Sequence, residues 1–333
     1  MLTESLTRKV YLATGSAHKD LAVEIAQHMG LPLQEDEIKV FPSDERYFRF
    51  NESVRGKHAI LIQSLASGKN GSVNDALMEL VLMIDAARRA SAHEITVVMP
   101  YMAYMRQDRK AKGREPISAA AVINLLQQTG ADRLVSIDMH SAQTQAVFDG
   151  PFDHLTAEGI IRDALAEKVG THHDEFIVVS PDGGRAKTSE IYAEELTIDV
   201  AHMPKRRSKD DPSVIKHPDF IEDVKGKTCI LIDDLIDTAG TIVSAAEVLQ
   251  KSGAKEVIVA ATHGVLSGPA LERLSNPAIS ELILTDTIPL DNAKEALGSK
   301  LTIIPSAPII ASSLEAIVTR DSLLQLFGGK NYS

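Results

Sequence analysis

The chain has 333 residues, a hydrophobic fraction of 44% and a formal net charge of −11, as expected of a globular protein of about two domains. The acidic balance argues against nucleic acid as a general partner, although a local cationic site can still bind a phosphate. A lone cysteine (Cys229), no apolar run of membrane-spanning length and no signal-like N-terminal block favour a cytoplasmic protein without a membrane partner.

Helix-like and strand-like patterns alternate along the chain. Apolar residues recur at helical spacing in the segments 21–30, 74–92, 117–130 and about 308–319. Short apolar runs typical of buried strands occupy 59–64, 94–99, 133–138, 176–180, 229–233, 256–261 and 281–285. This alternation predicts an α/β fold with central, largely parallel sheets flanked by helices. Ligands of such sheets bind at the carboxyl ends of the strands.

The two halves of the chain repeat one plan. In the first half a strand ends at Pro100, a polar loop and a helix follow, and another strand ends at Asp138. In the second half the same order runs from Pro181 to Asp233. The repeat predicts two similar α/β domains.

We place the domains at 1–154 and 155–307, and expect the last helical segment, about 308–333, to pack back on the first domain. The segment 203–218 is polar and has no periodicity. We expect it to form an extra, mobile loop of the second domain.

The most informative stretch is CILIDDLIDTAGTI at 229–242. An apolar strand stops at two carboxylates, Asp233 and Asp234, and a short loop of small residues leads into a helical pattern. This order points backbone N–H groups and a helix N-terminus at one spot, which favours a phosphate, while the acidic pair suits sugar hydroxyls or Mg²⁺. A sugar phosphate is the predicted ligand. The alternative is a plain turn whose aspartates cap the helix.

Other polar motifs follow other predicted strand ends. RQDRK begins at Arg106, DMH ends at His140, SPDGG contains Asp182, and KRR spans 205–207. Two cations on a closing loop would neutralise charge on a transferring group, and paired glycines let backbone approach a phosphate closely. Three of these motifs also have a plainer explanation: a solvated charge run for RQDRK, an ordinary hydrogen-bonding histidine for DMH, and an exposed basic loop for KRR.

Taken in order, these motifs resemble those of the ribose-phosphate diphosphokinase (phosphoribosyl diphosphate synthetase) family. The resemblance runs from about residue 10 to 327. It rests on NDALMELVLMIDAARRASA, PYMAYMRQDRKAKGREPISA, DMHSAQTQAVFDGPFDHL, KRR and IDDLIDTAGT. It implies two domains of the type I phosphoribosyltransferase fold, the first binding ATP and the second ribose 5-phosphate. The family transfers the diphosphoryl group of MgATP to the anomeric hydroxyl of the sugar, releasing AMP.

The resemblance also implies a role for individual residues. The catalytic cations would be Lys205 and Arg207. ATP would be bound by Phe41, Ser43, Asp44, Glu45, Arg106 and Gln107. Mg²⁺ would lie near His140 and Asp182. Ribose 5-phosphate would be held by Arg207, Asp233, Asp234, Asp237, Thr238, Ala239, Gly240 and Thr241. A regulatory phosphate would meet Ser53, Arg55 and Ser322. Dimers assembled into hexamers are implied as well, with the Phe41 loop reaching into a neighbouring site.

The chain departs from the family pattern at three places. Ser43-Asp44 stands where Asp-Gly is usual, and Leu324 stands where a serine is common. In SPDGG, Gly183 follows Asp182 directly. Either the loop is one residue shorter, or Gly183 fills the spacer position and Arg185 replaces the second glycine.

Two rival functions follow from the same residues. A non-catalytic regulatory subunit of the family is disfavoured by the intact KRR, RQ and DDLIDTAGT motifs, although the altered loops speak mildly for it. A phosphoribosyltransferase, which consumes the sugar diphosphate, is disfavoured by RQDRK and by the two-domain repeat.

Overall fold

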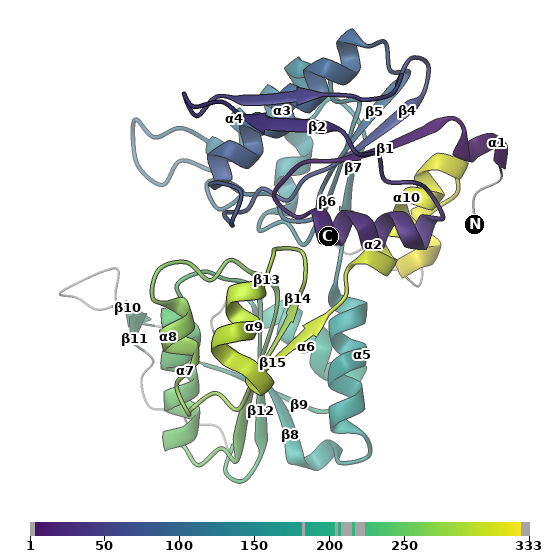
Figure 1. Cartoon of the computed structure of the whole chain (residues 1–333). Coiled ribbons are helices and arrows are strands. Elements are labelled where there is room, and N and C mark those ends of the chain that lie inside the picture. Colours follow the sequence, from purple (N-terminus) through teal and green to yellow (C-terminus); the bar gives the residue numbers. More distant parts are fainter. Residues whose placement is uncertain (1–3, 182–183, 204–205, 208–214, 217–223, 328–333) are drawn as a thin grey trace. The chain divides into compact units, whose positions relative to one another are not determined.

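The computed structural model describes residues 4–181, 184–203, 206–207, 215–216 and 224–327 (Figure 1). The chain forms two compact units. The first comprises Met1–Ala157, Thr287–Pro289 and Pro305–Ser333, and the second comprises Glu158–Asp286 and Leu290–Ile304. The first unit thus extends to residue 157 and also takes in residues 287–289 and 305–307, which lie within the range 155–307.

A parallel five-stranded sheet forms the centre of the first unit. Its strands lie side by side in chain order: β1 (Val10–Thr14), β4 (His58–Ile62), β5 (Glu94–Met99), β6 (Arg133–Ile137) and β7 (Phe152–Leu155). Around it lie α1 (Glu4–Thr7), α2 (Lys19–Met29), α3 (Val73–Arg89), α4 (Ser118–Thr129), η1 (Ala142–Val147), α10 (Ala307–Thr319) and η4 (Leu323–Phe327). The C-terminal helix α10, yellow in Figure 1, packs beside α2.

The helices of the first unit begin and end at residues with specific local chemistry. Ser72 caps α3 through a reciprocal capping box with Asp75. Helix α2 ends at Gly30, whose left-handed backbone (φ 65°) is the one that glycine adopts at little cost. The predicted helices at 21–30, 74–92 and 117–130 therefore match observed ones to within a few residues.

A two-stranded antiparallel hairpin stands apart from this sheet. Its strands are β2 (Glu37–Val40) and β3 (Arg46–Arg49), with Val40 opposite Arg46. Phe48 of β3 is buried in the same apolar cluster as α3 and α4. The hairpin therefore depends on side-chain packing rather than on hydrogen bonds to the main sheet.

The second unit contains a parallel six-stranded sheet. Its spatial order is β15 (Leu301–Ile304), β14 (Glu281–Thr285), β13 (Glu256–Gly264), β12 (Thr228–Ile236), β8 (Phe176–Ser180) and β9 (Asp199–His202). Helices α7 (Gly240–Lys251), α8 (Ala270–Leu274) and α9 (Asp291–Leu297) share one apolar cluster on one face. The unit also contains α5 (Glu158–Val169), α6 (Ala186–Leu196), η2 (His173–Glu175) and η3 (Gly298–Lys300), with α5 and α6 on the opposite side of the sheet (Figure 1).

The strand order of the second sheet reverses between β8 and β12. The chain passes from β8 to β9 on one side and later adds β12, β13, β14 and β15 on the other. A reversal of this kind leaves a crevice at the carboxyl ends of the two strands. The loops after β8 and β12 therefore flank the place where an open α/β sheet binds its ligand.

One sequence expectation needs correction. The strand expected to stop at Asp233 continues to Ile236, because its partner β13 also continues and pairs with it as far as Gly264. Within 203–218, the described residues form a short antiparallel ladder of β10 (Arg206–Arg207) and β11 (Ile215–Lys216), where the sequence showed no periodicity.

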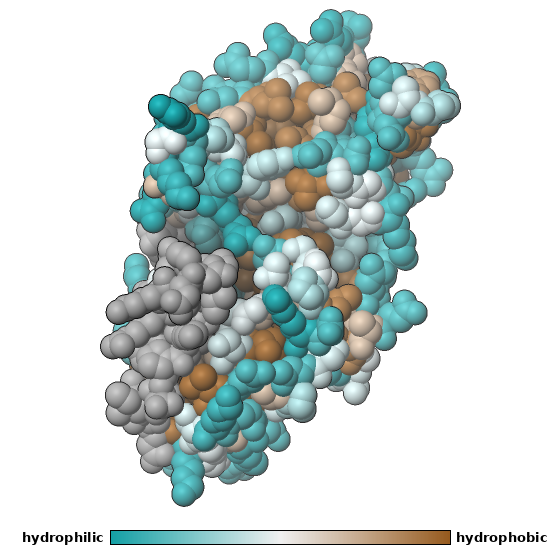
Figure 2. Space-filling view, turned by 90° about the vertical axis from the view of Figure 1, so that its left-hand side faces the viewer, coloured by the Kyte–Doolittle hydropathy of each residue, from teal (hydrophilic) through white to brown (hydrophobic). Residues whose placement is uncertain are grey.

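Aliphatic residues build both cores, as the shortage of aromatic residues requires. The central strands are buried on both faces, as in Ala59–Ile62 and Cys229–Ile232. On the surface, hydrophobic residues emerge in patches among hydrophilic ones on the face shown in Figure 2. No helix in the described part of the chain combines the length and the apolar character needed to cross a bilayer.

Candidate functional site

The acidic pair of the second unit is held by a cation from the neighbouring loop. The guanidinium of Arg185, which follows β8, places Nε 2.9 Å from Oδ1 of Asp233 and also contacts Oδ1 of Asp234 through Nη2. The backbone N–H of Asp234 donates to Oδ1 of Asp233 at 2.9 Å. The crevice between β8 and β12 therefore contains two carboxylates and one guanidinium in direct contact.

Burial changes the acidity of this pair. Burial and, after it, the negative charge of Asp234 raise the pKa of the Asp233 carboxyl to about 7, although Arg185 acts in the opposite direction. Asp233 therefore titrates near neutral pH, and its ability to accept hydrogen bonds as a carboxylate depends on the cation beside it.

The loop after β12 leads directly into a helix N-terminus. Helix α7 begins at Gly240, and its N-cap residue is Ala239, which has a left-handed backbone (φ 59°) and provides no side-chain cap. The Asp237 carboxylate accepts from the Ser267 hydroxyl. The N-cap residue itself thus provides no side-chain cap, and the N–H groups of the first turn face the loop.

A second cation holds the loop from the side of α8. Nη1 of Arg273 donates to the carbonyl of Thr238 at 2.9 Å. A Cβ at Gly240 would lie only 3.3 Å from the same nitrogen, so a side chain there would crowd it. Sequence analysis did not predict a role for Arg273 or Ser267, because each meets the loop through a contact about 30 residues away in the chain.

In the first unit, the predicted adenine loop is the turn of the β2–β3 hairpin. Phe41 donates its N–H to the Glu45 carbonyl at 2.9 Å, and the Ser43 hydroxyl donates to the Glu45 carboxylate at 2.7 Å. Asp44 has a left-handed backbone (φ 64°), the conformation that glycine, usual in the family at this position, adopts most easily. Asp44 therefore adopts in this turn a conformation that glycine also allows.

The Phe41 ring remains available to a ligand. It makes an edge contact with Tyr47, with ring centroids 5.9 Å apart, and 44% of the residue is exposed. An aromatic ring in this position can stack on a base.

The predicted ATP pair Arg106–Gln107 lies in the loop after β5, and both residues are exposed. Gln107 accepts from the Ser118 hydroxyl at the start of α4, and its carbonyl accepts from the N–H of Ala119. The amide is therefore oriented by the helix that follows the loop.

The loop after β6 presents His140. Asp138 takes a positive φ of 37° and accepts from the N–H of Ala157 at 3.0 Å. The next N–H, of Met139, donates to Nε2 of His154 at 2.8 Å. Since Nε2 accepts here, the proton of His154 is assigned to Nδ1. Burial lowers the pKa of His154, and Asp138 opposes that change. The neutral ring thus holds the loop that presents the exposed His140.

The remaining predicted residues are spread over other parts of the chain. Ser53 and Arg55 lie in an exposed turn before β4, where the N–H of Arg55 donates to the Ser53 hydroxyl at 3.4 Å. Ser322 is exposed beyond α10 and accepts from the N–H of Leu324. Arg207 lies in β10, paired with Ile215. Asp182 and Lys205 lie outside the described residues.

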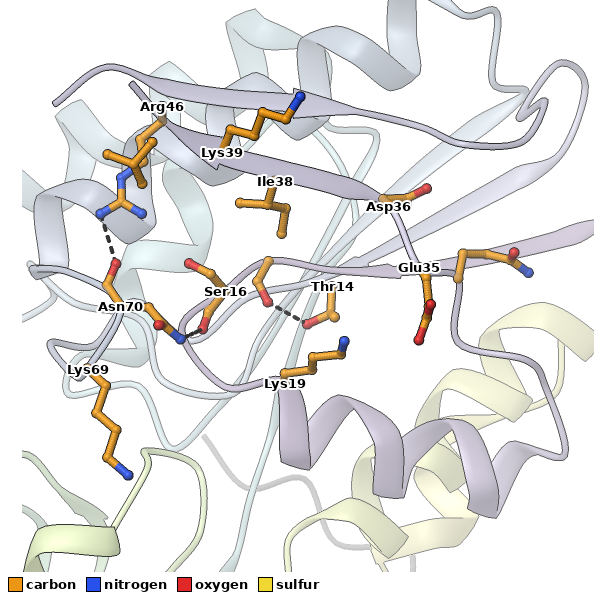
Figure 3. A pocket seen from close by; sticks show the side chains of 13 residues that line it. Thr14, Ser16, Lys19, Glu35, Asp36, Ile38, Lys39, Arg46, Lys69 and Asn70 are labelled. Carbon is orange, nitrogen blue, oxygen red and sulfur yellow. Dashed lines mark hydrogen bonds between the residues drawn. The ribbon is translucent and has the colours of Figure 1, made fainter. Parts of the chain in front are cut away.

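A cavity of about 710 Å³ lies within the first unit, between the carboxyl end of β1, the β2–β3 hairpin and residues 69–70 (Figure 3). The thirteen residues that line it include none of the predicted site residues. It is bordered by Thr14, Gly15, Ser16, Lys19, Gln34, Glu35, Asp36, Ile38, Lys39, Val40, Arg46, Lys69 and Asn70.

Comparison with known proteins identifies the family. Residues 10–130 match the family model of the N-terminal domain of ribose phosphate pyrophosphokinase, and residues 180–328 match that of the phosphoribosyl synthetase-associated domain. Pyrophosphokinase and diphosphokinase are two names for one activity.

Relatives match over nearly the whole chain. The ribose-phosphate pyrophosphokinase of Bifidobacterium longum is 44% identical over 96% of this chain and 93% of its own length. That of Caldanaerobacter subterraneus subsp. tengcongensis is 45% identical over 96% of this chain and 98% of its own. The crystal structure of phosphoribosylpyrophosphate synthetase from Mycobacterium smegmatis has 40% identity and a TM-score of 0.85, covering 94% of this chain and 99% of that one. The chain therefore belongs to the ribose-phosphate pyrophosphokinase family.

Proposed function

We propose that this chain transfers the diphosphoryl group of MgATP to the anomeric hydroxyl of ribose 5-phosphate, giving phosphoribosyl diphosphate and AMP. The observation that carries the proposal is the end of β12. There, two carboxylates precede a helix N-terminus whose N-cap residue, Ala239, provides no side-chain cap. A phosphate suits the helix N-terminus, and sugar hydroxyls suit the carboxylates. The names of the relatives agree with this chemistry.

Ribose 5-phosphate would bind along the loop after β12. The N–H groups of Ala239, Gly240 and Thr241, with the hydroxyls of Thr238 and Thr241, would donate to the 5-phosphate. Asp233, Asp234 and Asp237 would then orient the sugar hydroxyls. Arg185 supports this arrangement, because a guanidinium beside the pair favours the charged, accepting form of the carboxylates.

ATP would bind to the loops of the first unit. Phe41 would stack against the base, and Ser43, Asp44 and Glu45 would accept from its amino group or position the turn. Arg106 and Gln107 would hold the nucleotide by fork-shaped hydrogen bonding. The exposure of Phe41, Arg106 and Gln107 supports these roles.

The chemical step would depend on positioning and charge neutralisation. The anomeric hydroxyl oxygen attacks the β-phosphorus of ATP in line with the departing AMP oxygen, so one P–O bond forms as another breaks, and the hydroxyl proton passes to the departing phosphate or to solvent. Lys205 and Arg207 would neutralise the negative charge that develops, and the step requires no covalent nucleophile on the protein.

Mg²⁺ would neutralise phosphate charge on the nucleotide. It prefers oxygen ligands and usually binds through one or two carboxylates together with substrate phosphates and water. The carboxylate of Asp182 fits that preference. The imidazole of His140, exposed after β6, suits a metal-bound water or a phosphate oxygen at least as well as the ion itself.

We further propose that the chain works as a homo-oligomer, with dimers assembled into hexamers and the Phe41 turn reaching a neighbouring site. Ser53, Arg55 and Ser322 would bind a regulatory phosphate. The setting would be the reducing cytoplasm, which the lone, buried Cys229 favours.

The test is to incubate the purified chain with ATP, Mg²⁺ and ribose 5-phosphate and to follow AMP. We expect AMP to form only when the sugar phosphate is present and in equal amount with phosphoribosyl diphosphate. AMP formation that is independent of the sugar, or none at all from folded protein, would refute the proposed reaction. A base-exchange assay with phosphoribosyl diphosphate provides the control for a transferase.

A further inference from the structure

Arg46 is the first residue after the predicted adenine turn, and its side chain is directed inward. It belongs to β3, directly opposite Val40 at the other end of the turn. Only 8% of the side chain is exposed, although it carries a charge and lies on a two-stranded hairpin. A charge buried to this extent needs partners from the rest of the unit.

Those partners come from the start of α3 and from the loop before it. Nη2 donates to the carbonyl of Asn70 at 2.8 Å and lies 3.4 Å from Oδ1 of Asp75. Nη1 lies 3.6 Å from Oε2 of Glu79, which is fully buried. One guanidinium therefore joins the turn end of the hairpin to a loop and to two carboxylates of α3.

The chain makes room for this guanidinium at Gly71. A Cβ on Gly71 would lie 2.3 Å from Nη2 of Arg46 and 2.8 Å from Cβ of Asp75. The backbone of Gly71 also has a φ of 141°, which side-chain-bearing residues rarely adopt. Glycine at this position thus allows the cation to approach α3.

The hydrogen bonds of Arg46 connect through Asn70 to the carboxyl end of β1. Figure 3 shows Arg46 bonded to Asn70, whose Nδ2 donates to the carbonyl of Ser16 at 2.7 Å. The Ser16 hydroxyl in turn donates to the buried Glu79 at 3.0 Å. Hairpin, loop and strand end therefore share one hydrogen-bonded network within the first unit.

We propose that Arg46 is a positioning residue for ATP: by tying the hairpin to α3 and to Asn70, it holds the Phe41–Glu45 turn in its binding geometry. An isolated two-stranded hairpin is marginal in water, and this one makes no ladder with the main sheet. Packing of Phe48 holds the middle of β3, whereas Arg46 holds the end next to the turn. The inference rests on the proposed binding of adenine at that turn.

The principal experiment measures steady-state kinetics of Arg46→Met, which keeps the apolar stem but loses the guanidinium. We expect KM for ATP to rise roughly ten-fold, because the loss of one charge-assisted interaction at Arg46 weakens binding of the nucleotide only indirectly, through the turn. The values of kcat and of KM for ribose 5-phosphate should stay within about two-fold of the parent chain. Arg46→Lys should recover only part of the affinity, because an ammonium cannot bridge both carboxylates as a fork does. The matched control is Arg49→Met on the same strand, whose side chain is 61% exposed and pairs with Glu37 at the surface.

Two glycine variants test the same contact of Arg46 without changing the charge of the chain. Gly71→Ala should displace the Arg46 guanidinium and raise KM for ATP as Arg46→Met does. Gly68→Ala should leave KM for ATP unchanged, because nothing lies within 4 Å of the Cβ that it would add. Hydrogen exchange of the amides in 40–46 provides a readout independent of activity, and we expect faster exchange in Arg46→Met and Gly71→Ala only.

The outcomes separate this inference from the function on which it rests. If Phe41→Ala raises KM for ATP while Arg46→Met and Gly71→Ala leave both KM and exchange as in the parent, the positioning role is wrong and the adenine assignment stands. If Phe41→Ala has no effect either, the adenine assignment itself fails. A rise in both substrates' KM values together with a fall in kcat would make Arg46 a general structural residue and overturn the proposal.

Discussion

The two units build sheets of the same class but arrange their strands differently. In the first unit β1, β4, β5, β6 and β7 follow one another across the sheet in chain order, whereas in the second the order reverses between β8 and β12. The reversal brings Arg185 and the acidic pair into contact through adjacent strands. In the first unit the candidate residues for ATP and the metal come from three separate loops. Topology thus assembles the site of the second unit, while side chains such as Arg46 and His154 hold the loops of the first.

The largest effect is expected at the basic loop of the second unit. Lys205→Ala should lower kcat by roughly 10³-fold, because a cation that stabilises transition-state charge in phosphoryl transfer has that order of effect. Turnover measured from AMP release is the readout, and Lys227→Ala, a lysine of the same unit that pairs with Asp199, is the control. Unchanged turnover in folded Lys205→Ala would remove this residue from the mechanism.

Removing the cation of the crevice should shift a pH profile. The pKa of Asp233 already rises to about 7, and Arg185 opposes the rise, so Arg185→Gln should raise it further. We expect kcat/KM for ribose 5-phosphate to reach half its plateau roughly one pH unit higher than in the parent. Arg162→Gln, which removes an ion pair elsewhere in the unit, should leave the profile in place. An unshifted profile in Arg185→Gln would show that the acidic pair does not govern sugar binding.

A smaller effect is expected from the side of α8. Arg273→Ala releases the Thr238 carbonyl and loosens the loop, so KM for ribose 5-phosphate should rise roughly three- to ten-fold with KM for ATP unchanged. Lys294, on the neighbouring α9, is exposed, and Lys294→Ala provides the control variant. Equal changes for both substrates would contradict a local role of Arg273.

The smallest effects concern the free energy of unfolding. Its dependence on pH has opposite signs for His154 in the first unit and for Asp233 in the second. The pKa of His154 is lowered in the fold, so the unfolded chain binds more protons below about pH 6.5, and stability falls on acidification by up to about 1.4 kcal/mol per pH unit. The pKa of Asp233 is raised in the fold, so the contribution of this carboxyl to stability is fully present below about pH 4 and is lost as the pH rises through about 7.

Denaturant unfolding of His154→Gln between pH 5 and 7.5 tests whether His154 makes the chain less stable on acidification. The variant should show a shallower loss of stability on acidification than the parent, while His58, whose pKa burial also lowers, acts equally in both. Parallel curves would show that His154 does not titrate differently in the folded chain.

The fold was predictable because its signals are local. Apolar runs such as 94–99, 176–180 and 281–285 match the observed strands residue for residue, since buried parallel strands are apolar on both faces. The loop after β12 is likewise a local signal, because consecutive residues contain the acidic pair Asp233–Asp234, the small residues and the start of the helix.

The supporting residues were not predictable in the same way. Arg185 meets its carboxylates through a sheet order that only the fold reveals, and Arg46 and Gly71 fit each other across a gap of 25 residues. Strand β12 extends past Asp233 because β13 pairs with it, which no pattern within 229–242 encodes.

The central claim is that the loop after β12 binds a pentose phosphate, and titration calorimetry of ribose 5-phosphate tests it most directly. The folded parent chain, with Mg²⁺ and with or without a non-hydrolysable ATP analogue, should bind one sugar phosphate per chain. A Thr238→Val, Thr241→Val variant, which keeps the side-chain volume but loses both hydroxyls, should bind at least about ten-fold more weakly. Absence of binding by the parent, or equal binding by the variant, would contradict the account.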